Sequence, residues 1–469
     1  MTHVHFIGIG GSGLSAIARL LLESGYDVTG SDRTLSPLGE DLRKAGARVY
    51  LGHAAANVDG ADWVVRSSAI PDDNLEVAAA LQLQIPVYKR ADFLGRLMED
   101  KLGIAVAGTH GKTTTSAMIA WILLQLGQDP SFIVGGVLAN LGVNARAGQG
   151  RTFVIEADEY DRMFLGLKPH LAVVTNIEYD HPDCYPTPAD FRAAFVEFAG
   201  LVPADGALVV CAEDMGASEL AAEARRLGKR VIGYRIAEND KTESGEWVLA
   251  HNLTVNTRGG FSFNAVIRLG ITPISLPGIH LQVPGLHNVR NALAALAVIA
   301  LLGLPLEEVA QALAEFRGTG RRFDVKGEAR GVTVIDDYAH HPTEIRATLD
   351  AARARYPAGR IWAIWQPHTY SRTRALFDEF ALSFGEADQV VVSEIYAARE
   401  AREDFSAEKV VRAMRRSSAH FIPELSDISN YLVSHLEPGD IMIVLSAGDA
   451  DRVSATVLAR LQEGEVRHE

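Results

Sequence analysis

The sequence contains little cysteine, with Cys184 and Cys211 as the two cysteines in 469 residues. Two cysteines exclude a disulfide framework and a zinc ribbon, and they are typical of a protein in a reducing cytoplasm. Long hydrophobic runs are also missing, because no apolar stretch reaches the roughly 18 residues of a membrane-spanning helix. The opening residues MTHVHFIGIGG lack the pattern of a secretory signal. We therefore expect a soluble cytoplasmic protein with no membrane partner.

Basic residues are outnumbered by acidic ones, with 45 Lys and Arg against 59 Asp and Glu, so the formal net charge is −14. A net-acidic chain is a poor candidate for non-specific nucleic-acid binding, and we expect no nucleic-acid partner. Hydrophobic residues make up 48% of the chain, which is enough to form several cores. The length predicts about three domains.

Short β-rich runs alternate with helical stretches in three successive parts of the chain. This alternation predicts parallel sheets and an α/β fold, in which the first and third units resemble Rossmann domains and the middle unit resembles a phosphate-loop ATPase. Residues 247–283 have a different pattern, which predicts antiparallel strands. We place the domains at residues 1–100, 101–319 and 320–469.

A glycine-rich turn follows the first predicted strand and opens the first predicted helix. It contains Gly8, Gly10, Gly11 and Gly13, which match the G-x-G-x-x-G pattern. Glycines at these positions let backbone N–H groups approach a diphosphate at a helix N-terminus. Asp32 ends the next predicted strand, where a ribose-binding acid is expected. The pattern does not distinguish NAD from another nucleotide diphosphate.

A second glycine-rich turn lies at the start of the middle unit. Its residues are Gly108, Thr109, His110, Gly111, Lys112, Thr113 and Thr114. Val106 departs from the strict Walker pattern, but the strand–loop–helix context is that of a phosphate loop. Backbone amides would surround phosphate oxygens, Lys112 would contact the β- and γ-phosphates, and the Thr113 hydroxyl would bind Mg²⁺.

Acidic residues follow two further predicted strands of the middle unit. Glu156 comes first, with Asp158, Glu159 and Asp161 behind it, and Asp180 and His181 follow the next strand. Carboxylates at strand ends suit the Mg²⁺ that ATP chemistry requires. His181 is an unusual Mg²⁺ ligand, so a core role or a phosphate contact is an equal alternative.

Three more motifs carry polar residues of interest. His287, Asn288 and Asn291 share one face at the start of a predicted helix, where they could contact an adenine edge or cap the helix. Asp336, Asp337, Tyr338, His340, His341 and Glu344 follow a strand of the third unit. His368, Tyr370, Arg372 and Arg374 follow another, and the two arginines could bind a carboxylate or phosphate or lie on a solvated face.

Taken together, these motifs resemble the Mur ligases of peptidoglycan assembly, and in particular the member that adds the first amino acid. The segments that carry the resemblance follow the family's order over nearly the whole chain: HFIGIGGSGLSAIA, AVAGTHGKTTT, EADE, VVTNIEYDH, PGLHNVRNALAA, GTGRRFD, DDYAHHPTEI and QPHTYSRTR.

The resemblance implies an ATP-dependent ligase that joins L-alanine to the carboxylate of UDP-N-acetylmuramate through an acyl phosphate, with Mg²⁺. It implies a monomer or weak homodimer.

The resemblance also implies roles for individual residues. The first glycine loop, with Gly8, Gly10, Gly11, Ser12, Gly13 and Ser15, holds the UDP diphosphate, and Asp32 and Ser68 complete that substrate site. Thr113, Glu156 and His181 serve magnesium, and His287, Asn288 and Asn291 contact adenine. Arg322 contacts the ATP phosphates and Asp337 the ribose. The expected catalytic residues are Lys112, Glu156, His181, His340, His341 and Arg372, and Tyr338, His368, Tyr370 and Arg374 complete the acceptor site.

The chain departs from the family pattern at three positions. Thr369 replaces the arginine that helps to hold the acceptor's carboxylate, which leaves the selectivity for L-alanine open. Tyr160 replaces a serine, and Ser446 replaces a glycine. Phe195 stands where the ligases for later amino acids have a carbamylated lysine, and this favours the first ligase.

Other functions remain to be distinguished. Within the ligase class, the alternative acceptor is another amino acid or a preformed murein peptide. A nicotinamide-dependent dehydrogenase would explain the first glycine loop but not the phosphate loop. A nucleotide-sugar sensor without catalysis would have no need of Lys112, Thr113, Glu156 and His181.

Overall fold

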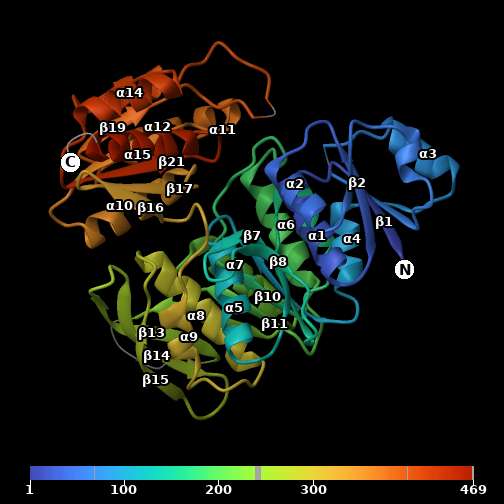
Figure 1. Ribbon diagram of the computed structural model, residues 1–469. Coiled ribbons are helices and arrows are strands. Elements are labelled where there is room, and N and C mark those ends of the chain that lie inside the picture. Colours follow the sequence, from blue (N-terminus) through green and yellow to red (C-terminus); the bar gives the residue numbers. More distant parts are fainter. Residues whose placement is uncertain (68, 238–244, 399, 467–469) are drawn as a thin grey trace.

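The computed structural model describes residues 1–67, 69–237, 245–398 and 400–466. The described strands form three sheets of five, ten and six strands. Figure 1 shows one sheet in each of three successive parts of the chain, with helices packed on their faces. The predicted α/β fold with three units is therefore confirmed. None of the described helices is both long and apolar enough to cross a membrane.

The N-terminal sheet is wholly parallel, with the strand order β3-β2-β1-β4-β5. Val4 and Phe6 of β1 are buried in one apolar core and Ile7 in another, so apolar side chains cover both faces of this strand. The strands are β1 (His3–Ile7), β2 (Asp27–Asp32), β3 (Arg48–Leu51), β4 (Trp63–Arg66) and β5 (Val87–Lys89). The helices are α1 (Ser12–Glu23), α2 (Pro37–Lys44), η1 (Ala55–Val58), α3 (Leu75–Gln82) and α4 (Arg90–Leu97).

The central sheet has the order β15-β14-β13-β12-β11-β10-β6-β9-β7-β8. Its middle strands are parallel, whereas β13, β14 and β15 pair antiparallel with one another, as residues 247–283 predicted. These three strands extend the parallel sheet, because β12 pairs with β13. The strands are β6 (Leu102–Ala107), β7 (Ser131–Leu138), β8 (Val143–Arg146), β9 (Thr152–Glu156), β10 (Leu171–Val174), β11 (Ala207–Cys211), β12 (Val231–Ile236), β13 (Trp247–Val255), β14 (Phe261–Arg268) and β15 (Ile274–His280).

Two helices of the central unit are buried on almost every side. α5 follows the phosphate loop and packs against α8 beneath the sheet, and both contribute to one large apolar core. A helix of this kind is apolar all round, so it holds the loop at its N-terminus in a fixed place. The helices are α5 (Lys112–Gln125), η2 (Tyr160–Gly166), α6 (Pro188–Gly200), α7 (Met215–Arg226), α8 (Leu286–Leu301) and α9 (Val309–Glu315).

The C-terminal sheet has the order β16-β17-β21-β18-β19-β20, and only β16 pairs antiparallel among its described strands. The strands are β16 (Asp324–Ala329), β17 (Val332–Asp337), β18 (Arg360–Trp365), β19 (Gln389–Val392), β20 (Ala419–Phe421) and β21 (Asp440–Leu445). The helices are α10 (Pro342–Arg355), α11 (Tyr370–Ala375), α12 (Phe377–Ala381), α13 (Glu408–Ala413), α14 (Leu425–His435) and α15 (Asp451–Val466).

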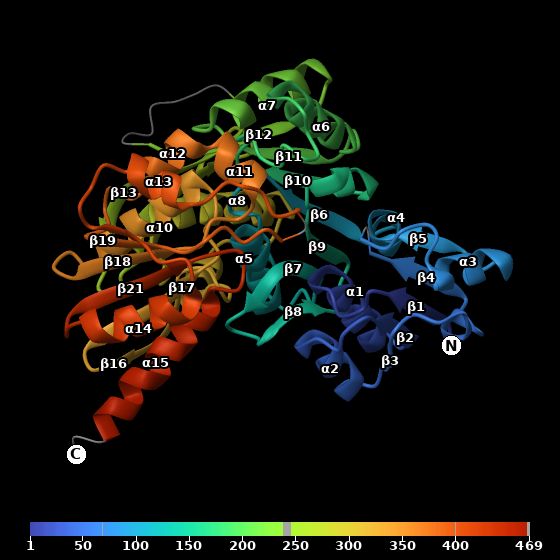
Figure 2. The same ribbon diagram turned by 90° about the horizontal axis from the view of Figure 1, so that it is seen from above.

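The polar motifs of the central and C-terminal units follow strands of their sheets: the phosphate loop follows β6, and the motifs of the third unit follow β17 and β18. Figure 2 shows the C-terminal unit over the central unit, with the N-terminal unit to one side. The strands of the three sheets lie within residues 3–89, 102–280 and 324–445. The domain boundaries at residues 100 and 319 stay a prediction.

Candidate active site

Residues at the end of β2 hold the first glycine loop by hydrogen bonds. Gly8 has a φ of +88°, and its N–H donates to the carbonyl of Ser31 over 2.8 Å. Asp32 accepts from the N–H of Gly10 at 2.9 Å, so its carboxylate braces the loop. A Cβ at Gly10 would lie 2.7 Å from Ser36 Oγ. Only glycine fits there, as close backbone approach requires.

The helix that follows this loop begins where the sequence predicts. Gly11 is the N-cap of α1, Ser12 is its first residue, and the N–H of Ser15 donates to the Gly11 carbonyl. A Cβ at Gly13 would lie 2.6 Å from the guanidinium of Arg90, so glycine lets α4 pack closely here. Ser68 lies outside the described residues. The role of this loop in binding the UDP sugar stays a prediction.

The phosphate loop has the conformation that its glycines predict. Gly108 and Gly111 have φ values of +131° and +81°. A Cβ would lie 2.1 Å from Thr175 Oγ1 at Gly108 and 2.8 Å from Asn291 Oδ1 at Gly111. The loop therefore has no room for a side chain at either glycine, and its backbone N–H groups are able to approach a phosphate closely. Thr113 and Thr114 lie in the first turn of α5.

The segment after β10 fastens the phosphate loop from the side. Asn176 Oδ1 accepts from the N–H of His110 at 2.8 Å, and Thr175 Oγ1 donates to the His110 carbonyl. Thr109 Oγ1 donates to the carbonyl of Glu178 at 2.7 Å and accepts from its N–H at 2.9 Å. The loop is thus held rigidly before any ligand binds, which favours electrostatic preorganisation.

Lys112 is buried and paired in this structure. Its ammonium group donates to the carbonyl oxygens of Gly108 at 2.6 Å and Thr109 at 3.1 Å, and it lies 2.9 Å from the carboxylate of Glu159. Burial lowers the pKa of Lys112, but the carboxylates of Glu159 and Glu156 outweigh burial and raise it. Lys112 is therefore a fixed cation at the phosphate loop.

The residues expected to serve magnesium surround this cation. Glu156 ends β9, and its Oε2 accepts from the N–H of Gly135 at 2.7 Å. His181 Nε2 lies 3.5 Å from Glu159 Oε1, and the buried His181 Nδ1 has no hydrogen-bond partner. The Thr113 hydroxyl and the Glu156 carboxylate are oxygen donors of the kind that Mg²⁺ prefers. Thr113 and Glu156 therefore fit a magnesium site, whereas His181 lies beside the carboxylates of Glu159 and Asp180 in this structure.

A cavity of about 330 Å³ opens beside the phosphate loop. It lies between central and C-terminal residues, and His287, Asn288 and Asn291 line it together with Arg322 and Asp337. These five residues were predicted to contact the nucleotide, and the structure places all of them on the walls of one cavity. Its size is that of a small-molecule site.

Hydrogen bonds to each other and to the backbone orient the two asparagines of α8 that line this cavity. Asn291 Nδ2 donates to Asn288 Oδ1 at 3.0 Å, and Asn288 Nδ2 donates to the Pro284 carbonyl at 2.6 Å. The N-cap of α8 is Gly285, so Asn288 does not cap this helix. Burial and the nearby Arg290 lower the pKa of His287 to about 4, so its ring is neutral.

Asp337 and Arg322 form the C-terminal wall of the cavity. Asp337 Oδ2 accepts from the N–H of Phe323 at 2.7 Å, and Oδ1 accepts from the N–H of Ala339 at 2.8 Å. Burial raises the pKa of Asp337 to about 6 despite these bonds and the nearby Arg322. Arg322 lies with its guanidinium 5.2 Å from the ring of Tyr338.

A buried ion pair joins the acceptor motif to the central unit. Arg372 on α11 donates twice to Asp180, at 2.9 and 3.1 Å, and both side chains are about 5% exposed. The Arg372 guanidinium holds the pKa of Asp180 well below its usual range, against the effect of burial. His181 follows Asp180 directly, so this pair brings the predicted acceptor residue to the predicted metal site.

The two histidines before α10 are neutral and oriented. His340 Nδ1 lies 2.9 Å from the Tyr338 carbonyl, and burial lowers the pKa of His340 to about 3. His341 is the N-cap of α10, and burial lowers its pKa to about 4. His340 also lies near His368, with ring centroids 5.9 Å apart. His368, His340 and Arg372 therefore form one group at the interface.

Arg374 does not join this group. Its side chain is 56% exposed, pairs with Glu403 and lies over the ring of Phe405. Tyr370 is buried, and its backbone N–H donates to Glu400 Oε2 at 2.7 Å. The predicted acceptor roles of Tyr370 and Arg374 stay predictions, and the structure favours Arg372 over Arg374 as the inward-facing arginine.

The positions that depart from the family pattern have structural explanations. The ring of Tyr160 packs edge-on against His181, with centroids 5.2 Å apart. Ser446 is fully buried and donates to Gln366 Oε1 at 2.7 Å. Phe195 is fully buried against Phe164 and Phe191, so no charged residue could replace it without cost. Thr369 is buried, and its Oγ1 lies 3.1 Å from Ser371 Oγ.

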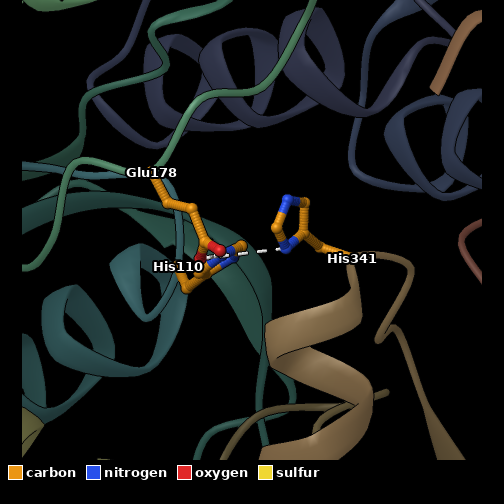
Figure 3. Close-up of side chains that lie close together, drawn as sticks. All are labelled: His110, Glu178 and His341. Atoms are coloured by element: carbon orange, nitrogen blue, oxygen red, sulfur yellow. Dashed lines mark hydrogen bonds and ion pairs between the residues drawn. The ribbon is translucent and has the colours of Figure 1, made fainter. Parts of the chain in front are cut away.

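Among the described residues, one set of histidine and carboxylate ligand atoms lies within 4.8 Å of one another, and it comprises His110, Glu178 and His341 (Figure 3). His110 Nε2 lies 2.9 Å from Glu178 Oε2, and His341 Nδ1 lies 3.8 Å from the same oxygen. Glu178 carried no individual role in the sequence analysis, although it stands in the segment VVTNIEYDH. Its position after a parallel strand was the one signal for it.

Comparison with known proteins identifies the family. The description "Mur ligase family, catalytic domain" matches residues 3–102, "Mur ligase middle domain" matches residues 106–299, and "Mur ligase, glutamate ligase domain" matches residues 321–448. The UDP-N-acetylmuramate–L-alanine ligase of Salinibacter ruber is 44% identical over 98% of this chain and 95% of its own. That of a Geobacter species is 44% identical over 98% and 97%.

Solved structures agree with this result. The UDP-N-acetylmuramate–alanine ligase of Thermotoga maritima superposes with a TM-score of 0.79 at 30% identity, covering 99% of this chain and all of the other. A murein peptide ligase from Psychrobacter arcticus superposes with a TM-score of 0.71 at 26% identity, covering 98% and 99%. The chain belongs to the Mur ligase family, together with the UDP-N-acetylmuramate–L-alanine ligases that it resembles over its whole length.

Proposed function

We propose that this protein is an ATP-dependent ligase that joins L-alanine to the carboxylate of UDP-N-acetylmuramate in cytoplasmic peptidoglycan precursor synthesis. The observation that carries the proposal is the buried Arg372–Asp180 pair. It joins the acceptor motif to the segment that holds the phosphate loop, so phosphate chemistry and amide formation have one centre. Relatives named for this activity at 44% identity support the choice of substrates.

The reaction divides into two steps that use different residues. A carboxylate oxygen of the nucleotide sugar attacks the γ-phosphorus of ATP, which gives an acyl phosphate and ADP. Lys112 and the backbone N–H groups of the phosphate loop stabilise the negative charge on the transferring phosphoryl group.

The second step forms the amide. The amine of L-alanine attacks the acyl carbon, and inorganic phosphate leaves from the tetrahedral intermediate. The proton that the amine loses leaves with the inorganic phosphate. His340 is neutral near pH 7, because burial lowers its pKa to about 3, so its ring can orient the acceptor by hydrogen bonding but is too weak a base to take this proton. Arg372 lies 3.0 Å from the His368 carbonyl and fixes the loop that faces His340.

Mg²⁺ belongs to the proposal as a cofactor. Thr113 and Glu156 would hold it, His181 stands beside them, and the ion would neutralise charge on the phosphate oxygens. The nucleotide would occupy the cavity of about 330 Å³. There His287, Asn288 and Asn291 would contact the adenine, Asp337 the ribose and Arg322 the phosphates.

The acceptor is tested by measuring phosphate release from ATP, Mg²⁺ and UDP-N-acetylmuramate with one acceptor at a time. L-alanine, glycine, L-serine and a murein tripeptide are compared. We expect release that depends on L-alanine, and this would show that Thr369 replaces the usual arginine without loss of selectivity. Release with the tripeptide alone would assign the chain to peptide recycling. The absence of phosphate release with every acceptor, despite binding of both nucleotides, would favour a sensor.

A further inference from the structure

His110 of the phosphate loop lies between two carboxylates from different domains. Its Nε2 is 2.9 Å from Glu178 Oε2, and its Nδ1 is 3.2 Å from Glu344 Oε1. Glu178 stands in the central unit after β10, whereas Glu344 stands in the first turn of α10. Both residues line the nucleotide cavity with His110. The imidazole ring thus bridges the central and C-terminal domains.

This geometry determines the charge of the ring. A neutral imidazole has one N–H donor, and an ionised carboxylate has acceptors only. Glu344 is ionised, because the N–H of His340 donates to it at 3.1 Å and Arg322 lies 3.4 Å away. Glu178 is also ionised, and its Oε1 accepts from Thr343 Oγ1 at 2.7 Å. His110 Nε2 forms a hydrogen bond with Glu178, whereas Nδ1 lies 3.2 Å from Glu344 Oε1 without hydrogen-bond geometry. Because each nitrogen faces an ionised carboxylate oxygen, the two glutamates favour the protonated ring.

The other charged groups near the ring do not change this result. His341 lies with its ring centroid 4.7 Å from that of His110, and its pKa of about 4 makes it neutral. His340 is also neutral, and Arg322 faces Glu344 rather than His110. Burial lowers the pKa of His110, but the bonds to Glu178 and Glu344 outweigh it and raise the pKa to about 9.

We propose that Glu178 and Glu344 are positioning residues that hold His110 as an imidazolium, so that docking of the C-terminal domain, which brings Glu344 to the ring, strengthens the positive charge of the phosphate site. Without Glu344 on α10, His110 would keep Glu178 as its carboxylate partner and would hold its proton less tightly. Docking of the acceptor domain therefore supplies positive charge to the loop that binds the ATP phosphates. The protein thereby favours ATP binding in the state that is competent to form the amide.

The backbone of the loop is held independently of this charge. The N–H of His110 donates to Asn176, and its carbonyl accepts from Thr175 and Asn176. Substitution of either glutamate by glutamine therefore removes charge while leaving the loop in place. Glu178→Gln and Glu344→Gln are matched in this respect, although Glu344 also caps α10.

The test is histidine NMR on the full-length protein without ligands. The His110 ring signals are assigned by their loss in His110→Gln, and their titration midpoint is measured in the wild type, Glu178→Gln and Glu344→Gln. We expect a wild-type midpoint above pH 8 and a midpoint lower by about one pH unit or more in each variant. Glu178→Asp, which keeps the charge, should restore part of the difference.

A control variant separates this effect from general electrostatics. Glu213→Gln removes a carboxylate from the same cavity wall, where Glu213 pairs with Arg290 at 3.0 Å, and it should leave the His110 midpoint unchanged. A wild-type midpoint near 6.5, or equal midpoints in the wild type and both glutamine variants, would overturn the proposal. Because no substrate is present, this result does not depend on the proposed ligase function.

A kinetic measurement connects the charge to ATP, and it rests on the proposed function. In Glu178→Gln, the KM for ATP should rise about tenfold between pH 6.5 and 8.5 as His110 loses its proton, whereas that of the wild type should stay nearly constant. The effect on kcat should be smaller, because Lys112 remains in place. A KM for ATP with the same pH dependence in both proteins would contradict the role of the charge.

Discussion

Lys112 has a structural role in addition to the catalytic role that we propose for it. Its ammonium group closes the phosphate loop and neutralises the buried Glu159. Its motif predicted the phosphate contact, because a lysine after a glycine turn at a helix start is a strong local pattern. Its partner Glu159 is 47 residues away and belongs to a run of four acids, so the pairing could not be chosen from the sequence.

Lys112→Ala should lower kcat by about a hundredfold or more, because it removes a preorganised cation from the transferring phosphoryl group. Binding of UDP-N-acetylmuramate should stay nearly unchanged, since the first glycine loop lies in the N-terminal domain. Phosphate release and calorimetric titration measure the two quantities. Lys112→Arg serves as the charge-preserving control, and loss of sugar-nucleotide affinity in Lys112→Ala would contradict the assignment.

Secondary structure was predictable wherever the local pattern is strong. A helix follows each glycine loop, as predicted, because the glycine turn and the apolar spacing agree there. The helix after the phosphate loop begins at Lys112, two residues before the start that its apolar spacing predicts. The strands in residues 247–283 were predicted as antiparallel, but their union with the parallel sheet was not. That union depends on the pairing of β12 with β13, which the alternation of side chains does not encode.

Helix α3 is fastened to the N-terminal sheet by Glu76, a fully buried carboxylate. Burial raises the pKa of Glu76, but bonds with His5, Ser31 and Asn57 outweigh this and lower the pKa to about 2. The folded pKa is thus below the unfolded value of about 4.3. Glu76 therefore stabilises the fold above that value and loses this contribution as the pH falls from about 4 to about 2.

Chemical denaturation of Glu76→Gln and the wild type should show this dependence. The free energy of unfolding of the wild type should fall more steeply between about pH 4 and about pH 2 than that of the variant, so the difference in stability between the two proteins becomes smaller in acid. Asp62→Asn provides a comparison, because Asp62 is exposed and accepts only from the N–H of His3. A gap that stays constant with pH would contradict the account of Glu76.

The arrangement of the whole molecule depends on contacts between residues that are far apart in the sequence. Arg372 and Asp180 are separated by 192 residues, and Thr343 and Glu178 by 165. The sequence predicted that residues of the three units meet, but only through the family resemblance. Which arginine faces inward, Arg372 or Arg374, depends on how α11 lies against the central domain.

Domain closure should depend on the Arg372–Asp180 pair. Removing one partner of a buried ion pair costs about 3–5 kcal/mol, because the other charge is left uncompensated. Small-angle scattering of the ligand-free protein should therefore give a larger radius of gyration for Asp180→Asn than for the wild type. Asp161→Asn, which removes an exposed carboxylate from another segment of the central unit, is the control. Equal radii of gyration for the wild type and Asp180→Asn would contradict this role.

The central claim is that ATP activates the sugar carboxylate at the centre where the amine then attacks. The most direct test uses UDP-N-acetylmuramate with ¹⁸O in both carboxylate oxygens, together with ATP, Mg²⁺ and L-alanine. Because a carboxylate oxygen attacks the γ-phosphorus, the account predicts that the phosphate released carries one ¹⁸O atom per amide formed. Phosphate without ¹⁸O, released while the amide forms, would contradict an acyl phosphate and with it the proposed chemistry.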